Sequence, residues 1–178
     1  MLSLNDLDFM KGFMRMCEDG WLQGWHERNG GNLSYRMTAS ETAQAMPLCD
    51  RTAPWRPLGV AVPELSGELF AVTGTGRYFR NVPLAPDRNV CLVEIGADGE
   101  TYRVVKGGEA GVEPTSELPT HLTCHAIRKA ETGGRDRVIY HAHPTNIVAM
   151  TFVLPVTARD ITRALWQSAT ECPVVFPG

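Results

Sequence analysis

Two histidines, His141 and His143, stand one residue apart in a segment, 137–143, that we expect to be a β-strand. On a strand, residues two apart share a face and lie roughly 6–7 Å apart at Cα. Two imidazoles at this spacing can bind one metal ion through their ring nitrogens. Two histidines satisfied by hydrogen bonds in a sheet are an equally weighted alternative, because a catalytic zinc site takes about three protein ligands.

A carboxylate, Glu117, follows Thr115 and Ser116 at the expected start of a helix. A helix N-terminus stabilises negative charge, and its backbone N–H groups can bind a phosphate. These residue types also serve as ordinary helix caps, which is the favoured interpretation of each one taken alone. Glu117 therefore becomes a candidate acid/base only in combination with other groups.

Two glycine loops, Asn29-Gly30-Gly31-Asn32 and Thr73-Gly74-Thr75-Gly76, present backbone N–H groups and short polar side chains. Such groups bind phosphates through charge-assisted hydrogen bonds. Neither loop matches a Walker A or a GxGxxG pattern, and each alone is typical of a tight turn beside a strand.

The other three histidines are His26, His121 and His125. His121 and His125 lie four residues apart on one face of a helix. They lack the glutamate of an HExxH zinc motif, so we predict a polar helix face.

The elements that must position these residues form a mixed α/β pattern without repeats. Apolar stripes and capping residues predict helices, while alternating or continuous apolar runs predict strands. The four prolines in residues 37–66 predict a long irregular excursion, and Trp25 and Trp166 read as core or subunit-interface aromatics. We expect helices over 4–17, 114–132, 144–154 and 157–169, and strands over 33–36, 68–72, 90–95, 101–105, 137–143 and 174–176.

Composition limits the classes of function. The 178 residues have a formal net charge of -3 and 43% hydrophobic content, which fits one globular domain. No basic stripe supports nucleic-acid binding. No apolar run approaches a membrane span, and the N-terminus lacks signal-peptide features, so we expect a cytoplasmic protein without a membrane partner. The five cysteines are scattered and odd in number, which predicts free thiols.

Taken in chain order, the two glycine loops, Thr115-Ser116-Glu117 and His141-Ala142-His143 resemble the class II aldolase/adducin family. Within that family, four further segments point to an aldolase that acts on L-rhamnulose 1-phosphate. These segments are 27–33, 79–82, Pro114-Thr115-Ser116-Glu117-Leu118-Pro119 and Thr170-Glu171-Cys172.

The resemblance implies an α/β/α sandwich with a mainly antiparallel central sheet, assembled as a homotetramer with active sites at subunit contacts. It implies reversible retro-aldol cleavage of the sugar phosphate to dihydroxyacetone phosphate and L-lactaldehyde, with one Zn²⁺ per subunit. By the same resemblance, the metal ligands are His141 and His143, the acid/base is Glu117, and Glu171 is a weaker catalytic candidate that acts in a neighbouring subunit. The substrate and phosphate residues are Asn29, Gly31, Asn32, Thr75, Gly76, Thr115 and Ser116.

One departure from the family pattern concerns the metal. The family supplies a third histidine ligand well after the pair, and this sequence has no histidine beyond His143. The apolar segment 174–176 also ends two residues before the terminus, with nothing after it to cover it. We therefore expect one domain, 1–178, whose C-terminal part is missing, and a chain that by itself is metal-free and inactive.

Three alternatives stay open. The chain could belong to another aldolase or epimerase of a related sugar phosphate. It could be a non-catalytic, adducin-like interaction module, although the presence of Glu117, His141 and His143 weighs against that. An exposed strand edge after 174–176 could also promote association of the chain.

Overall fold

The computed structural model describes residues 3–168, which fall into two compact units. The first unit is Met1–Ala142 and the second is His143–Gly178. Each unit is described by itself below. The strand expected over 174–176 and the candidate Glu171 lie outside the described residues.

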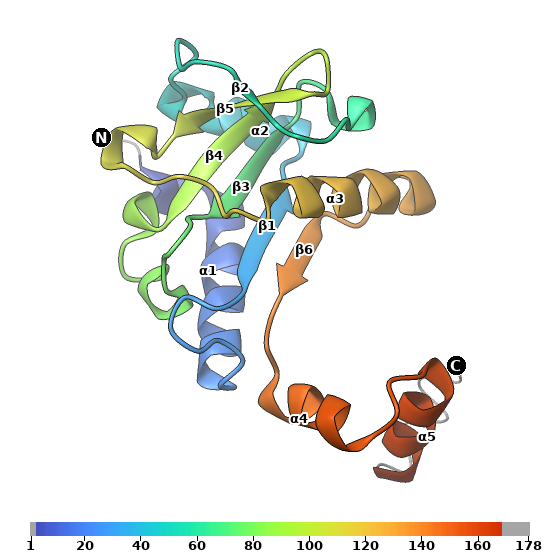
Figure 1. Cartoon of the computed structure of the whole chain (residues 1–178). Coiled ribbons are helices and arrows are strands. Elements are labelled where there is room, and N and C mark those ends of the chain that lie inside the picture. The colour runs from blue at the N-terminus through green and yellow to red at the C-terminus, as the bar shows by residue number, and fades with distance from the viewer. Residues whose placement is uncertain (1–2, 169–178) are drawn as a thin grey trace. The chain divides into compact units, whose positions relative to one another are not determined.

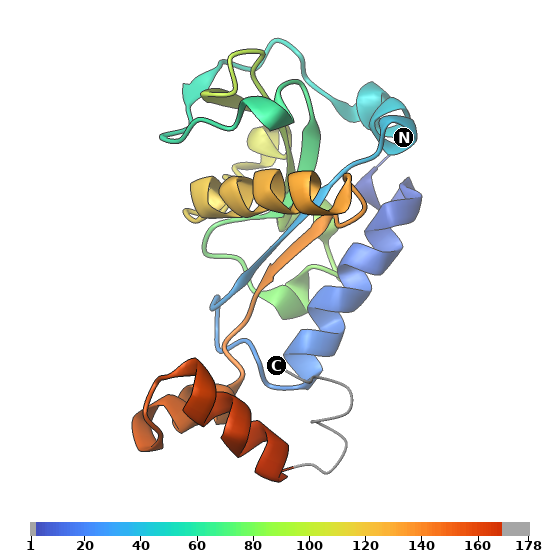
Figure 2. The ribbon, with the colours of Figure 1, turned by 90° about the vertical axis from the view of Figure 1, so that its right-hand side faces the viewer.

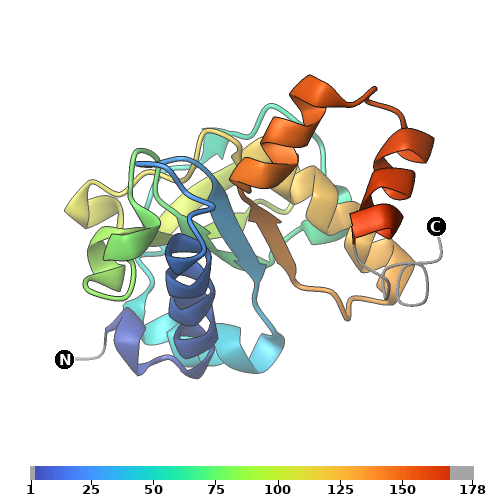
Figure 3. The same cartoon turned by 90° about the horizontal axis from the view of Figure 1, so that it is seen from below.

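The first unit is built on a six-stranded sheet in which all paired strands are antiparallel (Figure 1). The strand order is β2-β5-β4-β3-β1-β6, so β6 lies at one edge beside β1, as the view from below also shows (Figure 3). The strands are β1 (Asn32–Arg36), β2 (Arg56–Pro57), β3 (Leu69–Thr73), β4 (Val90–Ile95), β5 (Thr101–Lys106) and β6 (Val138–His141).

Helices cover both faces of this sheet, α1 (Asp8–Leu22) on one side and α3 (Leu118–Thr132) on the other (Figure 2). Side chains alternate along each strand. Leu69 and Ala71 of β3 therefore join the cluster beneath α1, whereas Phe70 and Val72 join Leu118 and Leu122 of α3. The expected α/β/α arrangement with an antiparallel central sheet is confirmed.

The ends of α1 and α3 follow from local chemistry. Ser3 and Asp6 form a reciprocal capping box on a short 3-10 turn, Leu4–Asp6, that leads into α1. Gly133 ends α3 in the left-handed conformation, with φ 59°. Met10 and Phe13 are buried, so the apolar stripe of α1 packs in the core, as its spacing predicts.

The segment between β1 and β3 is more ordered than the prolines suggest. It contains α2 (Ala39–Ala45), although its prolines predict an irregular excursion. Thr38 accepts a hydrogen bond from the Glu41 backbone, and the Glu41 carboxylate accepts one from the Thr38 backbone. This capping box satisfies two N–H groups of the first turn and starts the helix before the prolines begin.

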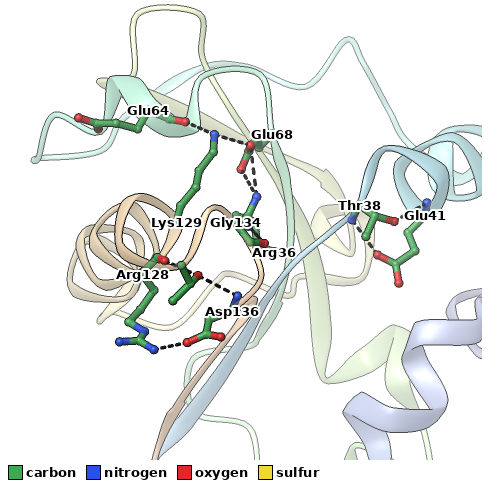
Figure 4. Close-up of polar contacts among 10 residues, drawn as sticks. Arg36, Thr38, Glu41, Glu64, Glu68, Arg128, Lys129, Gly134 and Asp136 are labelled. Atoms are coloured by element: carbon green, nitrogen blue, oxygen red, sulfur yellow. Dashed lines mark hydrogen bonds and ion pairs between the residues drawn. The ribbon is translucent and has the colours of Figure 1, made fainter.

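A polar network ties the C-terminal end of α3 to the sheet (Figure 4). Glu68 contacts both the Arg36 guanidinium, at 3.4 Å, and the Lys129 ammonium, at 2.8 Å. Arg36 also donates to the Gly134 carbonyl at 2.6 Å. Because the Arg36 side chain is only 5% exposed, these contacts keep its charge from being buried without partners.

The second unit contains α4 (Thr145–Val153) and α5 (Ala158–Ser168). Thr157 caps α5 by accepting from the Asp160 backbone at 3.1 Å, as predicted, and Pro144 is the N-cap of α4. Trp166 is 37% exposed, as is Trp25 in the first unit, so neither is a core aromatic. Within residues 3–168, no helix combines the length and the apolar character needed to cross a membrane.

The cysteines of the described part are all free, as expected. Cys17 and Cys91 lie in the core, where burial raises the pKa of both thiols. A thiol held in its neutral form reacts slowly, so these residues act as small apolar side chains. The four are Cys17, Cys49, Cys91 and Cys124.

Candidate active site

The sheet register gathers polar side chains on the face that α3 covers. Asn32 lies opposite His141, and Ser34 lies opposite Ile139. Ser34 also lies opposite Val72, whose side chain packs with α3. The alternation of β6 therefore places Ile139 and His141 toward α3, and Tyr140 packs on the opposite face with the α1 cluster.

The strand that carries His141 is shorter than the sequence predicts. β6 ends at His141 itself, and His143 begins the second unit. The expectation that both rings project from one strand is therefore wrong for His143, because Pro144 and the start of α4 follow at once and pairing with β1 stops at Asn32. A metal site shared by His141 and His143 stays a prediction.

Glu117 contacts His141 directly. The Nδ1 atom of His141 lies 2.8 Å from the Glu117 Oε2 atom, and the two side chains are 37% and 43% exposed. Glu117 is the N-cap residue of α3, as the sequence predicts, so its carboxylate meets the positive end of the helix dipole. A carboxylate next to an imidazole, both open to solvent, can exchange protons with a bound ligand.

Two backbone hydrogen bonds join the second glycine loop to the segment before α3. The Thr75 amide donates to the Glu113 carbonyl at 2.8 Å, and the Thr115 amide donates to the Thr73 carbonyl at 3.0 Å. The Thr73 hydroxyl in turn accepts from the Leu33 amide of β1 at 3.0 Å. The structure thus brings Thr75, Thr115 and the start of β1 together from three distant parts of the chain.

His26 holds the first glycine loop in place. Its Nδ1 atom lies 2.9 Å from the Gly30 carbonyl, and its Nε2 atom lies 2.5 Å from the Tyr140 hydroxyl. The ring stacks on Phe79 with centroids 3.8 Å apart. A carbonyl only accepts, so Nδ1 carries the proton and the Tyr140 hydroxyl donates to Nε2. The loop backbone is therefore fixed by a buried imidazole.

Gly31 is required where this loop approaches β6. Its φ is 78°, and a Cβ atom there would lie 2.5 Å from the His141 carbonyl oxygen and 2.5 Å from His26 Nδ1. Both contacts are far below van der Waals distance, and one is with backbone. Only glycine lets Asn32 sit directly opposite His141.

His121 and His125 are buried, which corrects the predicted polar helix face. Burial lowers the pKa of His121 to about 4 and that of His125 to about 3, so both rings are neutral at pH 7. They are accommodated because β1 offers polar partners: His121 contacts the Asn32 side chain and Ser34, and His125 contacts Ser34. Two features of the sequence could have indicated this burial. Asn32 and Ser34 are polar residues two apart on a strand, so they share a face, and His121 and His125 are four apart on a helix, so they share one too.

A cavity of about 230 Å³ lies beside the predicted phosphate residues. Thr115 and Ser116 line it, together with Tyr102 and Glu113. Thr75 and Gly76 are exposed, and Asn29 is exposed on the first loop. Within residues 3–168, no group of three or more His, Cys, Asp or Glu side chains is placed to hold a metal ion.

Comparisons with known proteins show which family this chain resembles. Residues 11–175 match the family model described as Class II Aldolase and Adducin N-terminal domain. A rhamnulose-1-phosphate aldolase of Salmonella paratyphi B is 42% identical over 178 residues, which are 100% of this chain and 65% of that protein. One of Pectobacterium atrosepticum is 42% identical over 169 residues, which are 95% of this chain and 62% of that protein. The chain thus spans less than two thirds of the length of these relatives.

A solved structure shares the fold. A sugar-phosphate aldolase from Thermotoga maritima superposes with a TM-score of 0.68 and 23% identity, covering 94% of this chain and 66% of that chain. Because the family model covers residues 11–175, nearly all of the sequence, we conclude that this protein belongs to the class II aldolase and adducin family.

Proposed function

We propose that this chain carries the acid/base and phosphate-binding residues of an aldolase that cleaves L-rhamnulose 1-phosphate reversibly to dihydroxyacetone phosphate and L-lactaldehyde. The contact between Glu117 and His141, next to two joined polar loops, is the observation that supports it most strongly. The 42% identity to rhamnulose-1-phosphate aldolases supports the choice of substrate.

The phosphate of the substrate binds to short polar side chains and backbone N–H groups. Thr75 and Gly76 offer them from one loop, and Thr115 and Ser116 offer them from the segment that is hydrogen-bonded to it. N–H and O–H groups of this kind bind a phosphate dianion through charge-assisted hydrogen bonds. The Asn32 side-chain amide joins these phosphate donors, and Asn29 and Gly31 line the substrate site from the first glycine loop.

Glu117 is the residue that moves a proton. In the direction of synthesis, its carboxylate takes a proton from the hydroxymethyl carbon of dihydroxyacetone phosphate. That carbon then bonds to the aldehyde carbon of L-lactaldehyde, the carbonyl π bond opens, and the aldehyde oxygen takes up a proton to become a hydroxyl. Cleavage is the reverse, with the carboxylic acid returning the proton. The partial exposure of Glu117 keeps it accessible to the bound substrate.

A divalent metal ion, zinc by resemblance to the family, would supply a Lewis acid for the negative charge that develops on the substrate oxygens. Glu117 directs the Nδ1 atom of His141 toward its carboxylate, so the ring would hold the ion through Nε2. His143 is the second proposed ligand. Two imidazoles beside a carboxylate are donors that suit zinc, but they are fewer histidines than the family uses.

Zinc binding by the 178-residue chain should be weak. With His141 and His143 as its histidine ligands, we expect the purified chain to be metal-free and inactive, and a calorimetric zinc titration to give no stoichiometric, high-affinity step. Tight one-to-one binding that disappears in His141→Ala would contradict this expectation.

The activity is tested in a chimera in which this chain replaces the matching stretch of the Salmonella paratyphi B relative. We expect release of dihydroxyacetone phosphate from L-rhamnulose 1-phosphate at a higher kcat/KM than from L-fuculose 1-phosphate. A preference for the second substrate would assign the chain to another aldolase. Epimerisation without release of dihydroxyacetone phosphate, by a folded chimera, would refute aldolase function.

We further propose a cytoplasmic homotetramer with active sites at subunit contacts. This assembly rests on the family resemblance, as does the contribution of Glu171 to a neighbouring subunit's site. Sedimentation of the chimera measures it: a tetramer is expected, and a monomer that retains full activity would contradict sites built at subunit contacts.

A further inference from the structure

A buried row of polar side chains runs from the interior of the α3 face to Asn32. The Ser34 hydroxyl lies 2.9 Å from His125 Nε2 and 2.6 Å from His121 Nδ1. The Nε2 atom of His121 contacts the Oδ1 atom of Asn32. All four residues are at most 6% exposed, and Asn32 lies opposite His141 in the sheet.

The direction of the hydrogen bonds along this row follows from which atoms can donate. The Asn32 Oδ1 atom only accepts, so the proton of a neutral His121 is on Nε2. His121 Nδ1 is then an acceptor, and the Ser34 hydroxyl donates to it. A hydroxyl has one proton, so Ser34 must accept from His125, whose proton is also on Nε2. Burial keeps both rings neutral, which this assignment requires.

The opposite direction of these hydrogen bonds is disfavoured by the environment of His125, at the far end of the row. His125 Nδ1 is buried and, within the described residues, has no hydrogen-bond partner. It packs near Phe70, with ring centroids 5.1 Å apart. If the Asn32 amide were reversed, each proton would shift along the row and His125 Nδ1 would carry a buried, unpaired N–H group. An unpaired acceptor is the less costly of the two arrangements.

We propose that His125, Ser34 and His121 are positioning residues that fix the side-chain amide of Asn32, so that its NH₂ group is held as a donor for the phosphate of the substrate. The Asn32 oxygen is occupied by His121, and its nitrogen points away from that ring. Asn32 follows Gly31 directly and adjoins the Glu117–His141 pair through the register with β6. The inference rests on the proposed function, in which Asn32 binds the substrate.

The test has a first arm that needs no ligand. Long-range ¹H–¹⁵N spectra of the 178-residue chain report which ring nitrogen of each histidine carries the proton. We expect the Nε2–H tautomer for both His121 and His125 at pH 7. An Nδ1–H tautomer of His121 would overturn the inference and leave the proposed function standing.

The second arm follows the Asn32 side-chain amide signals during titration with inorganic phosphate. We expect Ser34→Ala and His121→Leu to weaken phosphate binding about tenfold or more, as the loss of one charge-assisted hydrogen bond would. His121→Gln, which keeps an N–H donor for Asn32, should restore part of the affinity. Leu122→Ala is the matched control: it removes a buried side chain of the same helix and should lower stability without changing the affinity for phosphate.

The outcomes separate the two claims. Unchanged phosphate affinity in folded Ser34→Ala and His121→Leu would overturn the positioning role alone. Wild-type protein that shows both expected tautomers but no Asn32 response to phosphate would refute the phosphate site, and the positioning role with it. Equal losses in Leu122→Ala and Ser34→Ala would mean that packing, not direction of the amide, controls binding.

Discussion

At the scale of single residues, the site depends on the close packing of the first glycine loop against β6 as much as on its reactive side chains. Glu117 meets His141 at 2.8 Å only because β6 and the end of the first glycine loop lie against each other. Gly31 occupies the point of contact, with the His141 carbonyl on one side and His26 on the other. A residue without chemistry of its own therefore sets the position of the residues that have it.

Gly31→Ala should be strongly destabilising. The new Cβ would clash with the His141 carbonyl and with His26, which we expect to cost about 2–3 kcal/mol in the free energy of unfolding. Gly24→Ala is the matched control, because Gly24 has a similar φ of 72° and nothing within 4 Å of its Cβ position. It should cost about 1 kcal/mol from backbone strain alone. Equal losses for the two variants in urea unfolding would contradict the role assigned to Gly31.

At the scale of elements, hydrogen bonds between loops assemble the site. Thr73 ends β3, and its hydroxyl contacts the Leu33 backbone, accepting at 3.0 Å and donating at 3.3 Å. The same residue's carbonyl accepts from the Thr115 amide before α3. One residue thus links β1, β3 and the segment that carries Glu117.

Thr73→Val should destabilise the unit by about 1–3 kcal/mol, because it leaves a buried backbone group of Leu33 without this partner. Thr123→Val is the control: that hydroxyl bonds the Pro119 carbonyl on an exposed helix face. Its loss should change the free energy of unfolding by less than about 0.5 kcal/mol. Chemical denaturation of both variants measures the difference, and a Thr73→Val protein as stable as the wild type would disprove the link.

Most elements could be predicted from sequence because one rule dominated each of them. Nearly continuous apolar runs marked β3 and β4, which are buried at every position, and Gly133 marked the end of α3. The errors arose where two rules competed. In residues 37–66 the prolines led to the prediction of an irregular segment, but the Thr38–Glu41 capping box starts α2 there. In residues 137–143 the sequence pattern of a strand continues to His143. Pairing with β1 stops at Asn32, opposite His141, so the strand ends there.

The residues that support the candidate site could not be predicted from the sequence. Glu117 lies at the start of α3, as the sequence predicts, but its contact with His141 was not predicted. His121 and His125 were predicted to form a polar helix face, because a sequence pattern gives the spacing of residues but not whether they are buried. Their burial depends on Ser34 and Asn32, which are nearly ninety residues away and are brought close only by the sheet.

At the scale of the whole molecule, the buried histidines couple folding to pH. Their pKa values, about 4 and about 3, lie below the unfolded value near 6.5, mainly because burial disfavours the charged ring. The unfolded chain therefore binds more protons below pH 6.5, so stability is fully present above that pH and falls as pH drops toward the native values.

The expected loss between pH 7.5 and pH 5 is about 2 kcal/mol for each histidine. Urea unfolding at the two pH values measures it. His125→Gln, which cannot titrate, should be less stable than the wild type at pH 7.5 but should show a smaller pH dependence. A wild-type stability that is constant from pH 7.5 to pH 5 would contradict the neutral, buried state of both rings.

The central claim is that Glu117 exchanges a proton with a substrate whose phosphate lies in the adjoining loops. Its most direct test is deuterium incorporation into the hydroxymethyl carbon of dihydroxyacetone phosphate in D₂O, followed by NMR with the zinc-loaded chimera and no aldehyde present. We predict incorporation that Glu117→Gln reduces at least about 100-fold and that Asp136→Asn, a change of a carboxylate that is paired with Arg128 outside the candidate site, leaves intact. Incorporation that persists in Glu117→Gln, or that is absent from the folded, zinc-loaded chimera, would contradict the account.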